Sequence, residues 1–271
     1  MIITPLILIG GIFGTLLLCY VTVVFLISRL TSDNSIMDVF YGPAFAVTAW
    51  LTIWMSGLWS LGAIVGASLV TVWAARLAIR IGRKNLGQPE DARYAKWRQA
   101  WCAHGTLYFT LRSYLQINLL QGIIIAIVSL PLIILITAQI DTLTPLMWLG
   151  ATVFILGLLY ETIADWQLDT FLARKRAGTE EATLMTQGLF AYSRRPNYFG
   201  ESVIWWGLAI LAFSTLPLGW LAFLSPLCIT YILTKVTGPM LEAQFLDRYP
   251  DEYSAYMAST NYFVPGKKKG V

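Results

Sequence analysis

The stretch whose residue types and spacing could most clearly do chemistry is the decapeptide Tyr192-Ser-Arg-Arg-Pro-Asn-Tyr-Phe-Gly-Glu201. It places arginines, an amide, phenols and a carboxylate directly before an apolar segment that runs from Ser202 to Phe213. Ionisable groups at the edge of a hydrocarbon layer are costly, so they are usually kept because they hold something polar. We therefore expect this stretch to bind a polar ligand.

Pro196 is disfavoured inside a helix, so the polar run is predicted to be a turn that leads into a helix, with Asn197 near its start. The free N–H groups at the beginning of a helix attract anions. Because Arg194 and Arg195 stand beside these groups, the sequence predicts an anion site here.

A second group consists of Glu161 and Asp165, which lie four residues apart and so share one face of a predicted helix. Two like charges at this spacing repel, and on an exposed surface the pair would be mildly destabilising. A shared cationic or hydroxyl-rich partner explains the pair better. We therefore interpret both carboxylates as ligand-binding residues.

Asp38 and Tyr41 stand one turn apart at the start of the second apolar stretch, so they share a helical face. They could meet a substrate, although Asp38 or Ser35 could equally be an ordinary helix N-cap. Arg76 is the deepest residue of a basic run that continues to Lys84. Other members of this run can snorkel to the membrane surface, which makes Arg76 the best candidate for a ligand contact.

The elements that must position these residues are apolar helices. The chain has 271 residues, of which 57% are hydrophobic and 13% charged, and its mean hydropathy of +0.64 excludes an ordinary soluble domain. A helix needs about 20 apolar residues to cross a bilayer. Such stretches lie near residues 5–28, 38–57, 59–81, 114–138 and 144–164.

A last apolar block, 202–236, is broken by Leu216-Pro217-Leu218-Gly219 and is long enough for two short spans. The sequence therefore predicts an all-α, polytopic membrane helical bundle of about seven transmembrane helices, of which the sixth is short. Residues 1–271 are expected to form a single integral membrane domain. The expected location is a bacterial inner (cytoplasmic) membrane.

Lysine and arginine predict the orientation. No basic residue precedes Arg29, so the chain lacks the charged start of a signal peptide and the first helix is expected to be retained. Basic residues gather in the 80–112 and 165–200 connections and in the tail, whereas the connections near Asp141 and Pro217 have none. The positive-inside rule then places the N-terminus outside and the C-terminus in the cytoplasm.

Several functions find no support in the sequence. The net charge of +4 is accounted for by orientation and headgroup contact, and no basic helix suggests nucleic acid binding. The cysteines Cys19, Cys102 and Cys228 are scattered, and His104 has no partner histidine. Neither a disulfide framework nor a metal site is predicted, because both need paired spacing.

The polar groups are expected to meet in one pocket at the cytoplasmic ends of the helices. Arginines suit phosphates and carboxylates suit ribose hydroxyls, so a dinucleotide or another nucleotide-containing cofactor fits this lining. A lipophilic substrate would enter from the membrane lipids. The amphipathic segment 241–256 is predicted to fold back under the bundle and close the pocket.

From about residue 34 to 265 the chain resembles the DUF1295 group of the steroid 5-alpha-reductase superfamily. The resemblance rests on an ordered set of motifs: Asp38, Trp73-x-x-Arg76-Leu, Glu90-Asp-x-Arg-Tyr94, Ala164-Asp-x-Gln167, Gly188-Leu, Tyr192-Ser-Arg-x-Pro-Asn-Tyr-x-Gly-Glu201, Trp205-Trp-Gly207 and Glu242…Tyr253-x-x-Tyr256…Pro265. It implies a membrane reductase that binds NADPH on its cytoplasmic side, with a cofactor-binding half near 140–265.

The resemblance also implies roles for individual residues. The residues matching Arg76, Asp165, Asn197, Glu201 and Tyr249 bind the cofactor in that superfamily, and Asp38 approximately matches an acidic residue that polarises the substrate carbonyl. With the residues chosen above, the candidate cofactor-binding set is Arg76, Glu161, Asp165, Arg194, Arg195, Asn197, Tyr198, Glu201 and Tyr249. The candidate catalytic residues are Asp38 and Tyr41.

One residue departs from the superfamily pattern. The steroid reductases have a tyrosine that grips the steroid carbonyl where this chain has Trp73, and an indole N–H cannot ionise or relay a proton. A 3-oxo-4-ene steroid substrate is therefore in doubt, and Tyr41 could serve as the donor instead.

We expect NADPH-dependent reduction of a carbon-carbon double bond in an enone-like, steroid-like or isoprenoid substrate. The hydride would go to the β-carbon, while Asp38, in its protonated form or through Tyr41, stabilises the developing enolate. The alternatives are an S-adenosylmethionine-dependent methyltransferase of the isoprenylcysteine or lipid type, which is distantly related, and a non-enzymatic lipid-binding protein.

Overall fold

The computed structural model of the chain describes residues 3–85, 87–213, 215 and 217–267. Within these ranges the regular structure is entirely helical, which confirms the all-α fold class. Six helices are long and apolar enough to cross a membrane, which indicates an integral membrane protein. They are Ile3–Thr31, Ile36–Ser56, Leu61–Asn85, Thr106–Val128, Pro145–Arg176 and Gly219–Arg248.

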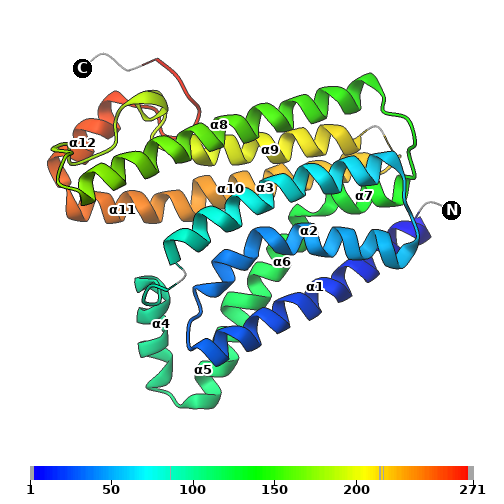
Figure 1. Ribbon diagram of the computed structural model, residues 1–271, viewed down its shortest axis with the longest axis horizontal. Coiled ribbons are helices and arrows are strands. Elements are labelled where there is room, and N and C mark those ends of the chain that lie inside the picture. Colours follow the sequence, from blue (N-terminus) through cyan, green and yellow to red (C-terminus); the bar gives the residue numbers. More distant parts are fainter. Residues whose placement is uncertain (1–2, 86, 214, 216, 268–271) are drawn as a thin grey trace.

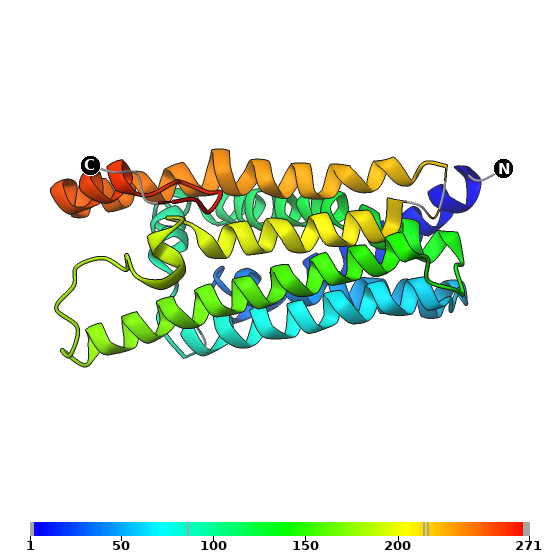
Figure 2. The same cartoon turned by 90° about the horizontal axis from the view of Figure 1, so that it is seen from above.

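Most of the helices run along the long axis of the molecule, whereas α4 lies across one end (Figure 1). The same long helices form a layered bundle when the molecule is turned (Figure 2). The α-helices are α1 (Ile3–Thr31), α2 (Ile36–Ser56), α3 (Leu61–Asn85), α4 (Ala92–Cys102), α5 (Thr106–Arg112), α6 (Leu120–Val128), α7 (Leu130–Ala138), α8 (Pro145–Arg176), α9 (Pro196–Phe213), α10 (Leu224–Tyr231), α11 (Gly238–Arg248) and α12 (Pro250–Ser259).

The helices differ from the predicted spans in three places. The fourth span begins at Thr106, contains a π-helical turn at Ser113–Leu119, and is followed by the separate helix α7. The expected short sixth span, α9, is not among the six long apolar helices, because its first turns carry polar residues such as Asn197 and Glu201. The predicted break at 216–219 includes residue 216, which lies outside the described residues.

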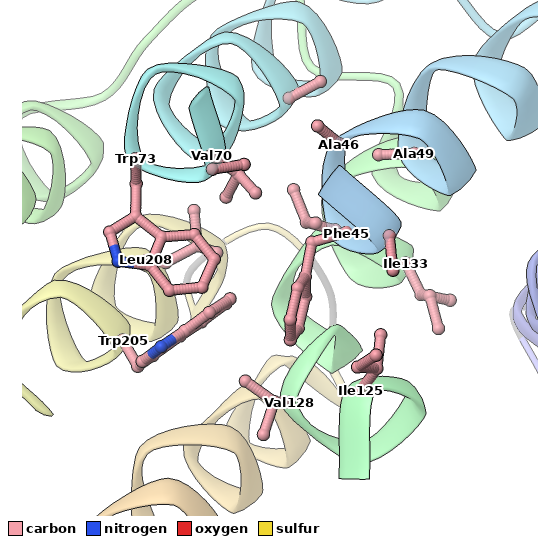
Figure 3. Packing of buried hydrophobic residues seen from close by; sticks show 14 of the residues in the cluster. Phe45, Ala46, Ala49, Val70, Trp73, Ile125, Val128, Ile133, Trp205 and Leu208 are labelled. Atoms are coloured by element: carbon pink, nitrogen blue, oxygen red, sulfur yellow. The ribbon is translucent and has the colours of Figure 1, made fainter. Parts of the chain in front are cut away.

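The centre of the bundle is an aromatic cluster formed by Phe45 of α2, Trp73 of α3 and Trp205 of α9 (Figure 3). The ring centroids are 5.6 Å apart for Phe45 and Trp73, 4.9 Å for Phe45 and Trp205, and 5.2 Å for the two tryptophans. Such tilted and edge-on contacts are favourable for aromatic rings. The cluster therefore holds three helices together.

Helices α8 and α9 pack against each other through their backbones. A Cβ atom added to Gly157 of α8 would lie 2.7 Å from the backbone nitrogen of Ile204, and one added to Gly200 of α9 would lie 2.7 Å from the Cβ of Glu161. Small residues allow this close approach of two helices in a membrane protein. As a result, Glu161 of α8 lies directly beside the first turns of α9.

Candidate functional site

A cavity of about 1510 Å³ lies at the end of the bundle where α2 and α9 begin and α3 and α8 end. Ligand sites for one small molecule usually measure about 300–1,000 Å³, so this cavity has room for two. Its wall carries eight of the predicted site residues: Asp38, Tyr41, Arg76, Asp165, Arg194, Arg195, Glu201 and Tyr249.

Arg76 joins the two carboxylates that the sequence places on one face of α8. Its guanidinium forms ion pairs with Glu161 and with Asp165, the latter at 2.7 Å. Both carboxylates are buried. A buried charge is tolerated where it has an oppositely charged partner. Of the two predicted kinds of shared partner, cationic or hydroxyl-rich, Arg76 is the cationic one.

Further charges surround this group. Arg80 lies 3.0 Å from Asp165 and 2.8 Å from Asp169, and Glu201 of α9 faces the same cavity. The cluster then contains more carboxylates than arginines. Carboxylate oxygens that have no cation of their own are good acceptors for hydroxyl groups of a ligand. Arg80 and Asp169 are parts of the site that the sequence interpretation had left out.

Arg194 is already occupied by protein groups. Its Nε donates to Glu242 at 2.7 Å, and its Nη1 donates to the carbonyls of Thr260 at 2.7 Å and Met257 at 3.2 Å. The guanidinium therefore fixes the C-terminal end of α12 and the residue after it against the start of α9. That Arg194 and Arg195 bind an anion together stays a prediction.

Arg195 has the opposite environment. Its Nε and one terminal nitrogen are buried and have no hydrogen-bond partner among the described residues. The guanidinium lies 5.4 Å from the centre of the Phe245 ring and 6.0 Å from that of Tyr198, at the cavity wall. Buried donors without acceptors are costly. An anion in the cavity would satisfy these donors, so this residue fits a phosphate-bearing cofactor.

Three predicted residues do not line the cavity. Glu161 lies behind Arg76, Tyr198 lies beneath the Arg195 guanidinium, and Asn197 sits in the first turn of α9 without a place among the lining residues. Glu161 and Tyr198 therefore contact residues of the wall rather than the cavity itself.

Basic groups also surround Tyr249. The Nζ atom of Lys175 lies 5.7 Å from the centre of its ring, and the guanidinium carbon of Arg248 lies 5.3 Å from it. Lys175 donates to the Thr183 carbonyl at 2.7 Å. Both cations line the cavity, and the sequence interpretation missed them as ligand-binding candidates. Their places in the last turns of α8 and α11 are the signal that could have identified them.

Asp38 lines the same cavity and does not cap its helix. Ser35 occupies the N-cap position, and Asp38 instead accepts hydrogen bonds from the Tyr94 hydroxyl at 2.6 Å and from Arg93 at 3.2 Å. Burial raises the pKa of Tyr94, so its hydroxyl stays protonated well above neutral pH. Neither Tyr94 nor Arg93 was among the predicted site residues.

Tyr41 reaches the cavity one turn further along α2. Its ring packs edge-on against Phe45 with centroids 5.3 Å apart. Among the described residues no hydrogen bond joins Tyr41 to Asp38. The two groups therefore meet the cavity independently.

Trp73 does not face the cavity. It is fully buried in the aromatic cluster and is not among the lining residues (Figure 3). Gln121 of the fourth span does line the cavity near Asp38, and its buried side-chain oxygen has no partner among the described residues. The indole at position 73 is therefore core packing, and Gln121 is a wall residue that the sequence did not reveal.

The sequence was compared with protein-family models, curated proteins and solved structures. Residues 24–260 match the family model described as "Protein of unknown function (DUF1295)". No curated protein and no solved structure matches the chain. The match covers most of the sequence, including the residues that line the cavity. The chain therefore belongs to the DUF1295 family.

Proposed function

We propose that this protein is a membrane-embedded reductase that uses NADPH to reduce a carbon-carbon double bond in a lipophilic, enone-like substrate of steroid or isoprenoid type. The observation that carries the proposal is the lining of the cavity of about 1510 Å³. Its wall combines the free donors of Arg195, an excess of carboxylates, and the polar groups Asp38 and Tyr41. This arrangement suits a phosphate-bearing cofactor beside a second ligand.

The cofactor side has groups for each part of a dinucleotide. Arg195 offers its buried donors to a phosphate, and Arg–phosphate hydrogen bonds are charge-assisted. Asp165 and Glu201 can accept hydrogen bonds from ribose hydroxyls, while Arg76 keeps Asp165 in place. Lys175 and Arg248 supply further positive charge for the 2′-phosphate that distinguishes NADPH from NADH. When bound, NADPH supplies the hydride.

The substrate side has an apolar wall with two polar groups. The apolar part is contributed by Ile124, Ile229, Ile232 and Leu233. Asp38 in its protonated form, or Tyr41, donates to the substrate carbonyl and stabilises the negative charge that develops on its oxygen.

The resemblance to the steroid 5-alpha-reductase superfamily supports this chemistry. Trp73 does not argue against it, because this indole lies in the core and leaves the substrate wall to other residues. We further propose that the protein lies in a bacterial inner membrane with the cavity on the cytoplasmic side, where the positive-inside rule places the lysines and arginines around it.

Calorimetric titration of the purified protein in detergent tests the proposal. NADPH should bind, and Glu201→Gln should weaken its binding, whereas Lys96→Gln should leave it unchanged because Lys96 is exposed and lies outside the cavity wall. Tight binding of S-adenosylmethionine in place of NADPH would instead support a methyltransferase. Binding of neither cofactor would support a lipid-binding protein.

A further inference from the structure

Helix α4 buries a single residue, Tyr94, which is 4% exposed. The other residues of this helix are exposed or half-buried. The ring of Tyr94 belongs to the hydrophobic core, and its hydroxyl donates to Asp38 Oδ1 at 2.6 Å. The buried side chain of α4 thus ends in a short hydrogen bond to a residue in the cavity wall.

The residues just before Tyr94 attach α4 to the start of α2. Glu90 accepts a hydrogen bond from the backbone nitrogen of Asn34 at 2.7 Å and two from Arg98 at 2.7 and 2.8 Å. The end of the connection to α2 and the second turn of α4 are therefore held by one carboxylate. Glu90 fixes the distance between Tyr94 and Asp38.

Arg93 adds a second donor to the same carboxyl group. It reaches Asp38 Oδ2 at 3.2 Å, and its Nε donates to Asp91 at 3.0 Å. Burial alone would raise the pKa of Asp91, but hydrogen bonds from Arg93 hold it below its usual value, so Asp91 remains charged and keeps Arg93 in place. Both oxygens of Asp38 therefore have a donor from the Glu90–Tyr94 segment.

We propose that Tyr94 is a positioning residue that holds the Asp38 carboxyl group in the wall of the cavity. Tyr94 does not itself line the cavity, so it acts on a ligand through Asp38. The catalytic part of this role rests on the proposed function, in which Asp38 meets the substrate. The hydrogen bond itself does not depend on any cofactor or substrate.

The effect of Tyr94→Phe distinguishes a positioning role of Tyr94 from a purely structural one. If Tyr94 only filled space, Tyr94→Phe would keep the ring and leave Asp38 unaffected. If Tyr94 holds the carboxyl group, loss of the hydroxyl changes the hydrogen bonding of Asp38 while the fold remains. Tyr108 on α5 is a suitable control, because its hydroxyl accepts a hydrogen bond from Arg112 and makes none with Asp38.

Infrared spectroscopy of the full-length protein in detergent, without NADPH or substrate, tests this role. The difference between wild type and Asp38→Asn assigns the bands of the Asp38 carboxyl group. We expect Tyr94→Phe to remove the hydrogen-bonded band and replace it with a shifted one, and Tyr108→Phe to leave it in place. An unchanged Asp38 band in Tyr94→Phe overturns the proposal.

A second measurement covers the case in which Tyr94→Phe fails to fold. In protein with 13C-labelled tyrosine, Asp38→Asn should shift the ring resonance of Tyr94, and an unshifted resonance also overturns the proposal.

Titration with NADPH separates this proposal from the proposed function. Wild type and Tyr94→Phe should bind NADPH with equal affinity. If wild type does not bind NADPH, the proposed function fails while the spectroscopic result on Tyr94 and Asp38 still stands.

Discussion

Arg194 and Arg195 are neighbours in the sequence, yet their guanidinium groups have opposite environments. Arg194 is hydrogen-bonded by a glutamate and by carbonyl groups, while Arg195 has buried donors without partners among the described residues. Two neighbouring arginines can thus have different roles. One stabilises the fold and the other remains available for a ligand.

This division predicts different effects of one substitution at two positions. Arg195→Gln should weaken NADPH binding about 10- to 100-fold, because a hydrogen bond to a charged group contributes about 1.5–3 kcal/mol, and should leave thermal stability unchanged. Arg194→Gln should lower the free energy of unfolding by about 3–5 kcal/mol, since it leaves Glu242 without its buried partner. Calorimetry measures NADPH affinity and thermal unfolding in detergent measures stability. If Arg194→Gln weakened NADPH binding and Arg195→Gln lowered stability, the two roles would be assigned wrongly.

A substitution at Asp38 separates catalysis from cofactor binding. Asp38→Asn should lower kcat by about 10²- to 10⁴-fold, the range expected for loss of general acid assistance, and should leave NADPH affinity at the wild-type level. The measurement is NADPH oxidation with a lipophilic enone that wild type reduces. Full turnover by Asp38→Asn would mean that the donor is Tyr41 or another wall residue.

The sequence could predict the part of the site that depends on local spacing. Glu161 and Asp165 share a face of their helix whatever the tertiary fold, so the sequence alone predicts that they need a common cationic or hydroxyl-rich partner. The partners of Arg194 are 48 to 66 residues away, and Tyr94 is 56 residues from Asp38. These pairings result from tertiary packing, which the local spacing of residues in the sequence does not predict.

Glycines set the distance between α8 and α9. Gly62 and Gly66 of α3 are four residues apart, a spacing typical of close helix packing, but a Cβ on Gly66 would meet a leucine side chain that can move. Gly157 instead approaches a backbone nitrogen, which cannot yield. Its counterpart on α9, Gly200, is far away in the sequence, and for this reason this close helix contact was not predicted.

Gly157→Ala should therefore destabilise the protein by about 1–3 kcal/mol, the usual cost of overpacking, because the two helices must move apart. Gly14→Ala is the matched control, since a Cβ there meets nothing within 4 Å and should stabilise α1 by up to about 1 kcal/mol. Thermal unfolding in detergent compares the two. Equal stability of both variants would show that the α8–α9 contact is looser than described.

The sequence also did not predict the π-helical turns at Ser113–Leu119 and Ile232–Thr237. Apolar periodicity predicts a helix but not one extra residue in a turn. Each turn borders cavity residues: Gln121 follows the first, and Leu233 belongs to the second. π-Helical turns frequently occur at functional sites, in agreement with their place here.

At the scale of the whole molecule, the fold class followed from composition, because a chain with such long apolar stretches can form little other than a helical membrane bundle.

The orientation in the membrane remains a prediction of the positive-inside rule. Single cysteines at Gln88, Thr179 and Gly266, in a chain without Cys19, Cys102 and Cys228, should resist an impermeant thiol reagent in intact cells. Labelling of Thr179→Cys from outside would place the cavity on the opposite side.

The end of the chain is bound to the decapeptide that carries the site. The backbone nitrogen of Arg194 donates to Asn261 at 2.8 Å, the Ser193 hydroxyl donates to Phe263 at 2.8 Å, and the nitrogen of Gly266 donates to Tyr192 at 3.1 Å. During synthesis these acceptors and donors leave the ribosome after all the long helices. The pocket can therefore reach its final form only after residues 261–266 have been synthesised, so a nascent chain stalled before Asn261 would lack the contacts that hold Tyr192, Ser193 and Arg194 in place.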